Sequence, residues 1–341
     1  MFTNNNHWPL EHWHIEVSSK CSLQCPRCTR QEVPHGLINT DLRLDWFKQH
    51  FIEIIPHVKK ITFCGDDGDP IYCRDFVEIC AWIKNKNYNC QIVIVTNGSY
   101  KTKQWWQLLS KVLDHRDHIH FSIDGDRETN TLYRVNADWD SIMIGIDTLN
   151  EQNCQVFRTW AAIAFKFNVS QLDSMRNIAK DKQFDYFQLT KSSKFGSNYQ
   201  AYPKDDPLEP NAEYVSQGRF TREIDQLSDR TWQDNCYETF ETRYHTQQPI
   251  GDIQPLCSVG NKGLYINAQG KFYPCCWTGL RYAHNRDIFQ YIHQENKKLT
   301  EILDDPNWST LTEGFNTNTC PQECKEKCSA NKWNLEHATS W

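Results

Sequence analysis

The sequence predicts an α/β fold, a partial (β/α)6 TIM-like barrel followed by a small C-terminal domain. Short apolar runs alternate with amphipathic stretches of helical period over the first two-thirds of the chain, as expected for parallel strands joined by right-handed helical crossovers. Cysteines and Gly/Asp turns stand where several of these runs end, and that edge carries the chemistry in barrels of this kind. The last part of the chain instead has turn residues, a short hairpin pattern and six cysteines.

The individual elements follow from the period of the apolar residues. Strands are expected at 14–18, 60–64, 91–96, 118–123, 156–165 and 186–189, and amphipathic helices at 44–55, 74–84, 103–113, 141–151 and 171–182. One more helix is expected at 220–229, within a polar, proline-containing stretch. These elements predict an N-terminal tail (1–12), a core barrel (13–191), a linker that shapes the substrate site (192–248) and a C-terminal domain (249–341).

Charge and composition exclude several classes of protein. Lys and Arg total 37 and Asp and Glu total 43, so the formal charge of −6 argues against a nucleic-acid-binding surface built on bulk positive charge. The first residues show no basic, apolar leader, and no apolar run reaches the roughly 18 residues that a membrane span needs. We therefore expect a cytoplasmic protein without a membrane partner, whose 15 cysteines are reduced and available as ligands.

The spacing of the cysteines separates them into groups. Cys21, Cys25 and Cys28 form a C-x3-C-x2-C motif directly after the first expected strand, and three thiolates on one loop can hold three corners of an iron–sulfur cluster. Structural zinc prefers four protein ligands, so the spacing favours iron–sulfur and leaves zinc as the alternative. Six others show no ligand spacing and are expected to be small buried side chains: Cys64, Cys73, Cys80, Cys90, Cys154 and Cys236.

Further motifs follow in order at the expected strand ends, and the ordered set resembles the radical S-adenosylmethionine (radical SAM) enzymes that carry a C-terminal SPASM/Twitch auxiliary-cluster domain. The resemblance covers about Trp13 to Cys328 and implies the radical SAM type of barrel. The motifs are the C-x3-C-x2-C triad, Gly65-Asp66-Asp67-Gly68-Asp69-Pro70, Thr96-Asn97-Gly98, Ser122-Ile123-Asp124-Gly125, Tyr133-Arg134 and the segment from Cys257 to Cys276.

The resemblance implies two cofactors in the barrel. Cys21, Cys25 and Cys28 would hold a [4Fe-4S] cluster whose fourth iron chelates S-adenosylmethionine. One electron would then cleave that molecule to methionine and a 5′-deoxyadenosyl radical, which takes a hydrogen atom from the substrate. The implied cofactor contacts are the methionine amino group at Gly68, Asp69 and Pro70, the ribose at Ser122 and Asp124, the methionine carboxylate at Arg134, and a further contact at Asn97.

Two positions depart from the family pattern, and two more are open candidates. Arg27 stands before the third cysteine, where the family usually has an aromatic residue, and Asp69 precedes Pro70 where the family usually has Glu. Asn168 and Trp160, near the fifth expected strand, are candidates to face adenosine or substrate, with core packing the alternative for Trp160. No residue is assigned as the catalytic one.

The C-terminal cysteines are similar to the first half of the SPASM/Twitch pattern. Gly270 stands at the turn of the expected hairpin, where a positive φ favours glycine. The segment has six cysteines, fewer than two clusters need, so we expect one auxiliary [4Fe-4S] cluster, with a zinc knuckle as the alternative. The predicted ligands are Cys257, Cys275, Cys320 and Cys324, with Cys328 and Cys276 as alternates.

The implied function is a radical SAM oxidoreductase or modifying enzyme acting on a peptide or small polar molecule. Flavodoxin or ferredoxin would supply the electron, and the auxiliary cluster would transfer electrons or bind substrate. Only 20 residues precede Cys21, so we expect no N-terminal peptide-binding domain. The alternative is a zinc protein, either hydrolytic or redox-active, or a non-catalytic interaction module.

Overall fold

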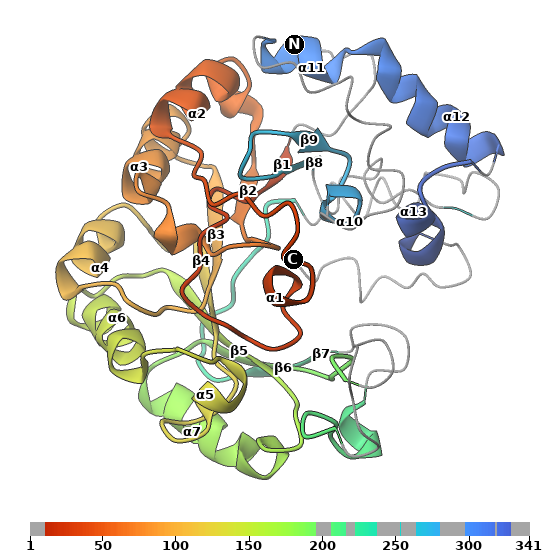
Figure 1. Ribbon diagram of the computed structural model, residues 1–341. Helices are drawn as coiled ribbons and strands as arrows, with labels where there is room; N and C mark the ends of the chain where they lie inside the picture. Colours follow the sequence, from red (N-terminus) through yellow and green to blue (C-terminus); the bar gives the residue numbers. More distant parts are fainter. Residues whose placement is uncertain are drawn as a thin grey trace. The chain divides into compact units, whose positions relative to one another are not determined.

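The computed structural model describes residues 11–195, 206–215, 222–236, 253, 264–279, 297–317 and 319–328 (Figure 1). The chain forms two compact units, and each is discontinuous in sequence. The first unit comprises Met1–Lys20, Gly36–Ile92 and Asp234–Trp341, and the second comprises Cys21–His35 and Val93–Gln233. Each unit therefore combines a segment from near the start of the chain with segments from further along it.

The sheet of the first unit is centred on the first strand of the chain. Strand β1 (His12–Ile15) pairs in parallel with β2 (Lys60–Phe63) on one side and with β8 (Leu264–Ile266) on the other. Strand β9 (Phe272–Tyr273) pairs antiparallel with β8 and completes a hairpin. Every residue of these four strands is buried, including polar residues such as His14 and Lys60, as expected for strands that are covered on both faces.

The helices of the first unit bury aromatic side chains and place the C-terminal cysteines. Helix α2 packs on α3, and α10 packs on β8, β9 and α13. The helical elements are α2 (Leu44–Phe51), η1 (Ile55–His57), η2 (Pro70–Tyr72), α3 (Phe76–Lys86), α10 (Cys276–Gly279), α11 (Leu299–Leu303), η6 (Pro306–Trp308), α12 (Ser309–Thr317) and α13 (Gln322–Lys327).

The second unit contains a sheet in the order β3-β4-β5-β6-β7. Strands β3 (Gln91–Thr96), β4 (His118–Ser122), β5 (Phe157–Ile163) and β6 (Tyr186–Thr190) are parallel, and β7 (Arg222–Gln226) is antiparallel to β6. Because parallel strands end at the same edge, the residues after β3, β4 and β5 lie along one side. The helical elements are α1 (Thr29–Glu32), α4 (Lys103–Ser110), α5 (Asn130–Tyr133), α6 (Trp139–Glu151), η3 (Val169–Gln171), α7 (Leu172–Asp181) and η4 (Ala212–Tyr214).

Side-chain contacts determine where α6 begins and how closely it packs on α4. The Asp138 side chain accepts hydrogen bonds from the backbone N–H groups of Asp140 and Ser141 and caps α6. Helix α6 then approaches α4 closely because Gly145 faces Trp106, and a Cβ at Gly145 would lie 2.6 Å from the indole ring. No helix among the described residues is long and apolar enough to cross a membrane.

The structure confirms the six predicted strands and the five predicted amphipathic helices, with ends that differ by a few residues. The helix predicted at 220–229 is wrong, because residues 222–226 form β7. The sequence Arg-Glu-Ile-Asp-Gln has one apolar residue, and Ile224 is 62% exposed, so no buried face marks the strand in the sequence. Backbone pairing with β6 decides its conformation.

Candidate functional site

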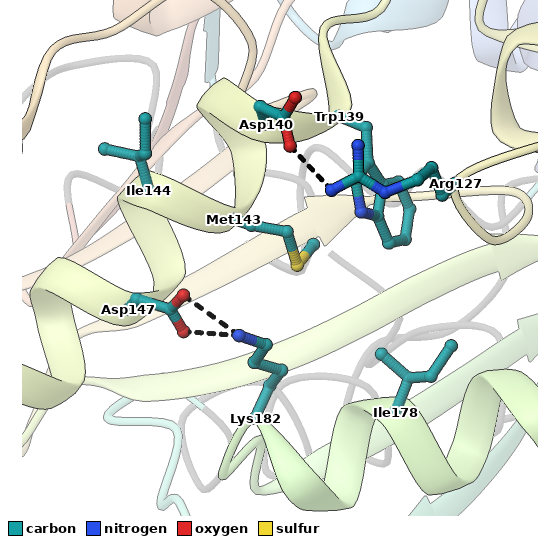
Figure 2. Close-up of a pocket in the computed structure, with 8 residues that line it drawn as sticks. All are labelled: Arg127, Trp139, Asp140, Met143, Ile144, Asp147, Ile178 and Lys182. Atoms are coloured by element: carbon teal, nitrogen blue, oxygen red, sulfur yellow. Dashed lines mark hydrogen bonds and ion pairs between the residues drawn. The ribbon is translucent and has the colours of Figure 1, made fainter.

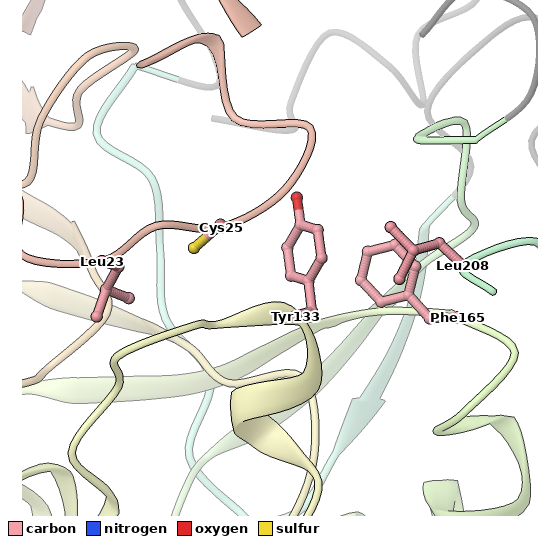
Figure 3. Packing of buried hydrophobic residues seen from close by; sticks show 5 residues of the cluster. All are labelled: Leu23, Cys25, Tyr133, Phe165 and Leu208. Carbon is pink, nitrogen blue, oxygen red and sulfur yellow. The ribbon is translucent and has the colours of Figure 1, made fainter. Parts of the chain in front are cut away.

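The three cysteines of the C-x3-C-x2-C motif lie on one loop of the second unit and contact one apolar cluster. Cys25 is buried among Leu23, Tyr133 and Phe165, together with Leu208 from a distant segment (Figure 3). Cys21 and Cys28 are half-buried and pack against the same cluster. The structure therefore brings all three predicted thiols together at one partly buried, apolar site.

Backbone hydrogen bonds fix the shape of this loop. The N–H of Cys28 donates to the carbonyl of Cys25 at 3.2 Å, and the carbonyl of Cys28 then accepts from Gln31 and Glu32 as α1 begins. The N–H of Gln24 donates to the carbonyl of Val135 at 3.0 Å, which ties the loop to the segment after α5. The amide of Asn97 donates to the Cys21 sulfur at 3.7 Å, so this residue contacts the cysteine motif.

The charges around the thiols suit a ligand that carries negative charge. Burial raises the pKa of the Cys25 thiol, and the nearby Arg134 guanidinium opposes that rise. Among the described residues, no group of three or more His, Cys, Asp or Glu side chains is arranged around a common point as in a formed metal site. Three soft sulfur donors on one loop, against an apolar wall and beside a cation, nevertheless fit an iron–sulfur cluster with one iron left open.

Arg27 has a role that the family pattern does not predict. Its backbone adopts φ 68°, and its buried guanidinium pairs with buried Asp206 at 3.0 Å. Asp206 also accepts from the N–H of Leu208, which belongs to the cluster around Cys25. The ion pair therefore joins the cysteine loop to the 206–210 segment, and the residue that replaces the family's aromatic side chain is part of the interior.

The predicted amine-binding turn lies in the first unit and is closely packed. A Cβ at Gly68 would lie 2.1 Å from the Ser18 carbonyl oxygen, and one at Gly65 would lie 2.5 Å from the Gly68 carbonyl oxygen, so both positions require glycine. The N–H of Asp69 donates to the Lys20 carbonyl at 3.0 Å, directly before the first cysteine in the chain. The Asp69 carboxylate is buried and accepts from the N–H of Ile71, which caps η2 at Pro70.

The remaining predicted cofactor contacts follow strand ends of the second unit. Asn97 is buried and forms a local turn by accepting from the N–H of Ser99, and Ser122 is half-buried at the end of β4. Asp124 is fully buried and accepts from the N–H of Ile163 at 2.6 Å and from Arg134 Nε at 2.5 Å. The Arg134 side chain remains 18% exposed. Burial lowers the pKa of Arg134, but the negative charges of Asp124 and Cys25 have the larger combined effect and raise it.

Asn168 and Trp160 both contribute to the interior. Trp160 is fully buried and donates to the carbonyl of Ile123 at 3.0 Å. Asn168 is also fully buried; its amide donates to the carbonyls of Asp124 and Ile163. These bonds connect the end of β4 to the end of β5, and they give both residues an architectural role.

The described part of the predicted auxiliary site brings several of its cysteines into the first unit. Cys320, Cys324 and Cys328 are buried around α13, and a hydrogen bond from Cys324 lowers the pKa of the Cys320 thiol to about 7. Cys275 is half-buried just before α10, and Cys276 is buried within it. Cys257 lies outside the described residues. Gly270 has φ 74° at the hairpin turn, as predicted.

The six cysteines without ligand spacing are mostly core residues. Cys73, Cys80, Cys90, Cys154 and Cys236 are buried, whereas Cys64 is half-buried. Burial raises the pKa of the Cys64 thiol, and it raises the pKa of Cys73 and of Cys236 to about 12. The thiols of Cys64, Cys73 and Cys236 are therefore protonated near neutral pH.

A separate cavity of about 550 Å³ lies along α6 and α7 and contains none of the predicted site residues (Figure 2). Arg127 pairs with Asp140 at 2.6 Å, and Lys182 pairs with Asp147 at 2.7 Å, across its surface. The other lining residues are Trp139, Met143, Ile144 and Ile178. The cavity is a surface groove between two helices, and the cysteine loop does not contribute to it.

Sequence comparison identifies the C-terminal part of the chain. Residues 257–329 match the SPASM family, described as an iron–sulfur cluster-binding domain. A tungsten-containing aldehyde ferredoxin oxidoreductase cofactor-modifying protein from Pyrococcus furiosus is 27% identical over 117 residues. That alignment covers 34% of this chain and 31% of the relative, so the chain matches about a third of the relative's length.

Comparison with solved structures identifies the fold. The chain is similar to anSMEcpe with bound AdoMet, with a TM-score of 0.54 and 15% identity over 92% of this chain and 80% of that one. It is also similar to Streptococcus suis SuiB bound to the precursor peptide SuiA, with a TM-score of 0.53 and 15% identity over 89% of this chain and 66% of that one. These likenesses confirm the predicted α/β fold class.

The chain thus has the fold of the radical SAM enzymes and carries a SPASM domain at its C-terminal end. The fold and the C-terminal domain agree with the resemblance inferred from the ordered motifs. The predicted iron–sulfur cofactor agrees with the description of the matched domain.

Proposed function

We propose that this chain is a radical SAM enzyme that abstracts a hydrogen atom from a peptide substrate. The observation that carries the proposal is the convergence of Cys21, Cys25 and Cys28 on one apolar cluster beside the Arg134 guanidinium. When bound, a reduced [4Fe-4S] cluster supplies one electron to the sulfonium of S-adenosylmethionine, which releases methionine and the 5′-deoxyadenosyl group that takes the hydrogen atom. The protein supplies the three thiolates and the low-dielectric wall behind them.

The chain's own residues would orient S-adenosylmethionine through opposite charges. The acidic turn at Gly68, Asp69 and Pro70 would accept the methionine ammonium group. The Arg134 guanidinium, whose Nε is held by Asp124, would present its remaining donors to the methionine carboxylate. Ser122 and Asp124 would approach the ribose, and Asn97 stands beside Cys21.

The choice of a peptide substrate is supported by the structural relatives. SuiB is described with a precursor peptide, and anSMEcpe is also described with a bound peptide, in a structure with a TM-score of 0.53 and 14% identity. In the C-terminal domain, Cys257, Cys275, Cys320 and Cys324 would hold one auxiliary [4Fe-4S] cluster that accepts an electron from the substrate or binds it. Flavodoxin or ferredoxin would reduce the first cluster.

The test is metal analysis and S-adenosylmethionine cleavage by anaerobically reconstituted protein. We expect about eight iron atoms per chain, as two cubane clusters require, and production of 5′-deoxyadenosine after reduction. The Cys21→Ala/Cys25→Ala/Cys28→Ala variant should retain about half of the iron and make no 5′-deoxyadenosine. Cys154→Ala is the matched control, because this cysteine is also buried in the second unit but lies away from the motif.

Two outcomes would overturn the proposal. Zinc without iron would favour the zinc-binding alternative, and cleavage by the triple variant would remove the three cysteines from the site. A peptide labelled with deuterium should transfer deuterium to 5′-deoxyadenosine; transfer only from a labelled small polar molecule would replace the peptide with that substrate class.

A further inference from the structure

Glu16 is a buried acid that neither the sequence motifs nor the proposed mechanism uses. It follows β1 in the first unit and is 3% exposed. Its Oε1 accepts hydrogen bonds from the backbone N–H groups of Asp67, at 2.6 Å, and Gly68, at 3.0 Å. One carboxyl oxygen therefore holds both amides at the centre of the predicted amine-binding turn.

The other carboxyl oxygen of Glu16 connects to the C-terminal hairpin. The Tyr265 hydroxyl donates to Glu16 Oε2 at 3.1 Å, and Tyr265 lies on β8, within the region that matches the SPASM domain. Tyr265 is 1% exposed and is fixed by β8, which pairs with β1 at His14. A single buried side chain therefore connects the SPASM hairpin to the turn after β2.

The packing around the turn makes this contact specific. Gly65 and Gly68 approach backbone atoms too closely to accept a Cβ, and a Cβ at Gly65 would also lie 2.9 Å from Glu16 Oε1. Burial, followed by the neighbouring carboxylates of Asp66 and Asp67, raises the pKa of Glu16 to about 8, although the two N–H groups oppose the rise. The carboxyl group is thus mainly neutral at pH 7 and accepts the two N–H groups without adding a third negative charge beneath the turn.

We infer that Glu16 is a positioning residue for S-adenosylmethionine, which sets the Gly65–Pro70 turn for the methionine amino group and, through Tyr265, couples that turn to the SPASM hairpin. This inference rests on the proposed function. Glu16 contacts the turn's backbone and acts on the cofactor through it. Because Glu16 binds the two N–H groups on the buried side of the turn, the carbonyl groups and side chains of the turn are left to face the ammonium group.

The first experiment uses protein without iron, so its readout is independent of the loaded enzyme. Hydrogen–deuterium exchange is measured on peptides covering 64–70, with 118–122 of β4 as an internal control. Glu16→Ala should speed exchange at Asp67 and Gly68 about tenfold, because both amides lose their acceptor. Glu16→Gln should stay within about twofold of wild type, because its amide oxygen still accepts both bonds and its NH2 group can donate to Tyr265.

The second experiment measures the Kd of S-adenosylmethionine by equilibrium dialysis of the reconstituted proteins. Glu16→Ala should raise the Kd about tenfold, Glu16→Gln should restore it, and Tyr265→Phe should raise it about threefold. Tyr273→Phe is the matched control, because Tyr273 packs beside Tyr265 on the same hairpin. If Glu16→Ala does not fold, Glu16→Gln and Tyr265→Phe still test the coupling.

The outcomes separate this inference from the proposed function. If wild-type protein binds no S-adenosylmethionine, both fail. If wild type binds it and Glu16→Ala and Tyr265→Phe bind it equally well, the inference alone is overturned. Equal weakening by Glu16→Ala and Glu16→Gln would also overturn it, because the acceptor oxygen would then not be the cause.

Discussion

At the scale of the residue, the ionisation of Glu16 makes the free energy of unfolding depend on pH. Its ordinary pKa of 4.5 is raised to about 8 in the folded chain, first by burial and then by Asp66 and Asp67. The folded state therefore binds a proton more tightly than the unfolded state. The titratable side chains facing it are Asp66, Asp67 and Cys64 around the turn, and Tyr265 on β8.

We predict that the contribution of Glu16 to the free energy of unfolding is fully present below pH 4.5. It is lost as the pH rises to about 8, and above that pH it no longer changes. The expected slope is about 1.4 kcal/mol per pH unit between these limits. Denaturant unfolding of wild type and Glu16→Gln across this range isolates it, because Gln does not titrate. A difference between the two proteins that does not change with pH would contradict the assignment.

Glycine at position 68 is required by backbone contact. We predict that Gly68→Ala lowers the free energy of unfolding by about 1–3 kcal/mol, because its Cβ would overlap the Ser18 carbonyl at 2.1 Å. Gly36→Ala is the comparison: Gly36, unlike Gly68, has a positive φ, of 74°, but its Cβ would meet no atom within 4 Å. Chemical denaturation compares them, and a loss in Gly68→Ala no larger than that in Gly36→Ala would show that the contact with Ser18 does not carry the cost.

At the scale of the element, the buried Arg27–Asp206 pair joins two segments far apart in sequence. We predict that Arg27→Met destabilises iron-free protein by about 3–5 kcal/mol, because buried Asp206 loses the guanidinium that balances its charge. The Arg27→Met/Asp206→Leu double variant should recover most of this loss. Urea unfolding provides the measurement, and a double variant as unstable as the single one would show that the segments depend on the charges themselves.

At the scale of the whole molecule, ligand binding should stabilise the fold that presents the thiols. We predict that reconstitution with iron and sulfide raises the Tm on the order of 5 °C, because clusters bind the folded chain in preference to the unfolded one. The triple cysteine variant should show a smaller rise, whereas Cys154→Ala should match wild type. Differential scanning calorimetry under anaerobic conditions measures this, and an unchanged Tm would argue against cluster binding.

Sequence periodicity predicted the alternating strands and helices because each buries one face or a whole short run, and motif order at the strand ends placed the cysteine triad. The exposed strand β7 was missed because its conformation depends on pairing with β6. Glu16 was missed because its partners Gly68 and Tyr265 are 52 and 249 residues away. The hydrogen bonds that Asp124 accepts from Ile163 and Arg134 could not be predicted from the sequence either.

The pairing of β1 with β8 also has a consequence for biosynthesis. Trp13 pairs with both Ile61 and Leu264, so one side of β1 gains its partner early and the other only after some 200 further residues have been made. At about 5–20 residues per second, that side stays unpaired for roughly 10–40 s while the chain leaves the ribosome. The hydrogen bond from Tyr265 to Glu16 also forms only after β8 has been made, so the first unit is completed late in translation. We therefore expect iron–sulfur assembly factors to act after β8 has been made and has paired with β1.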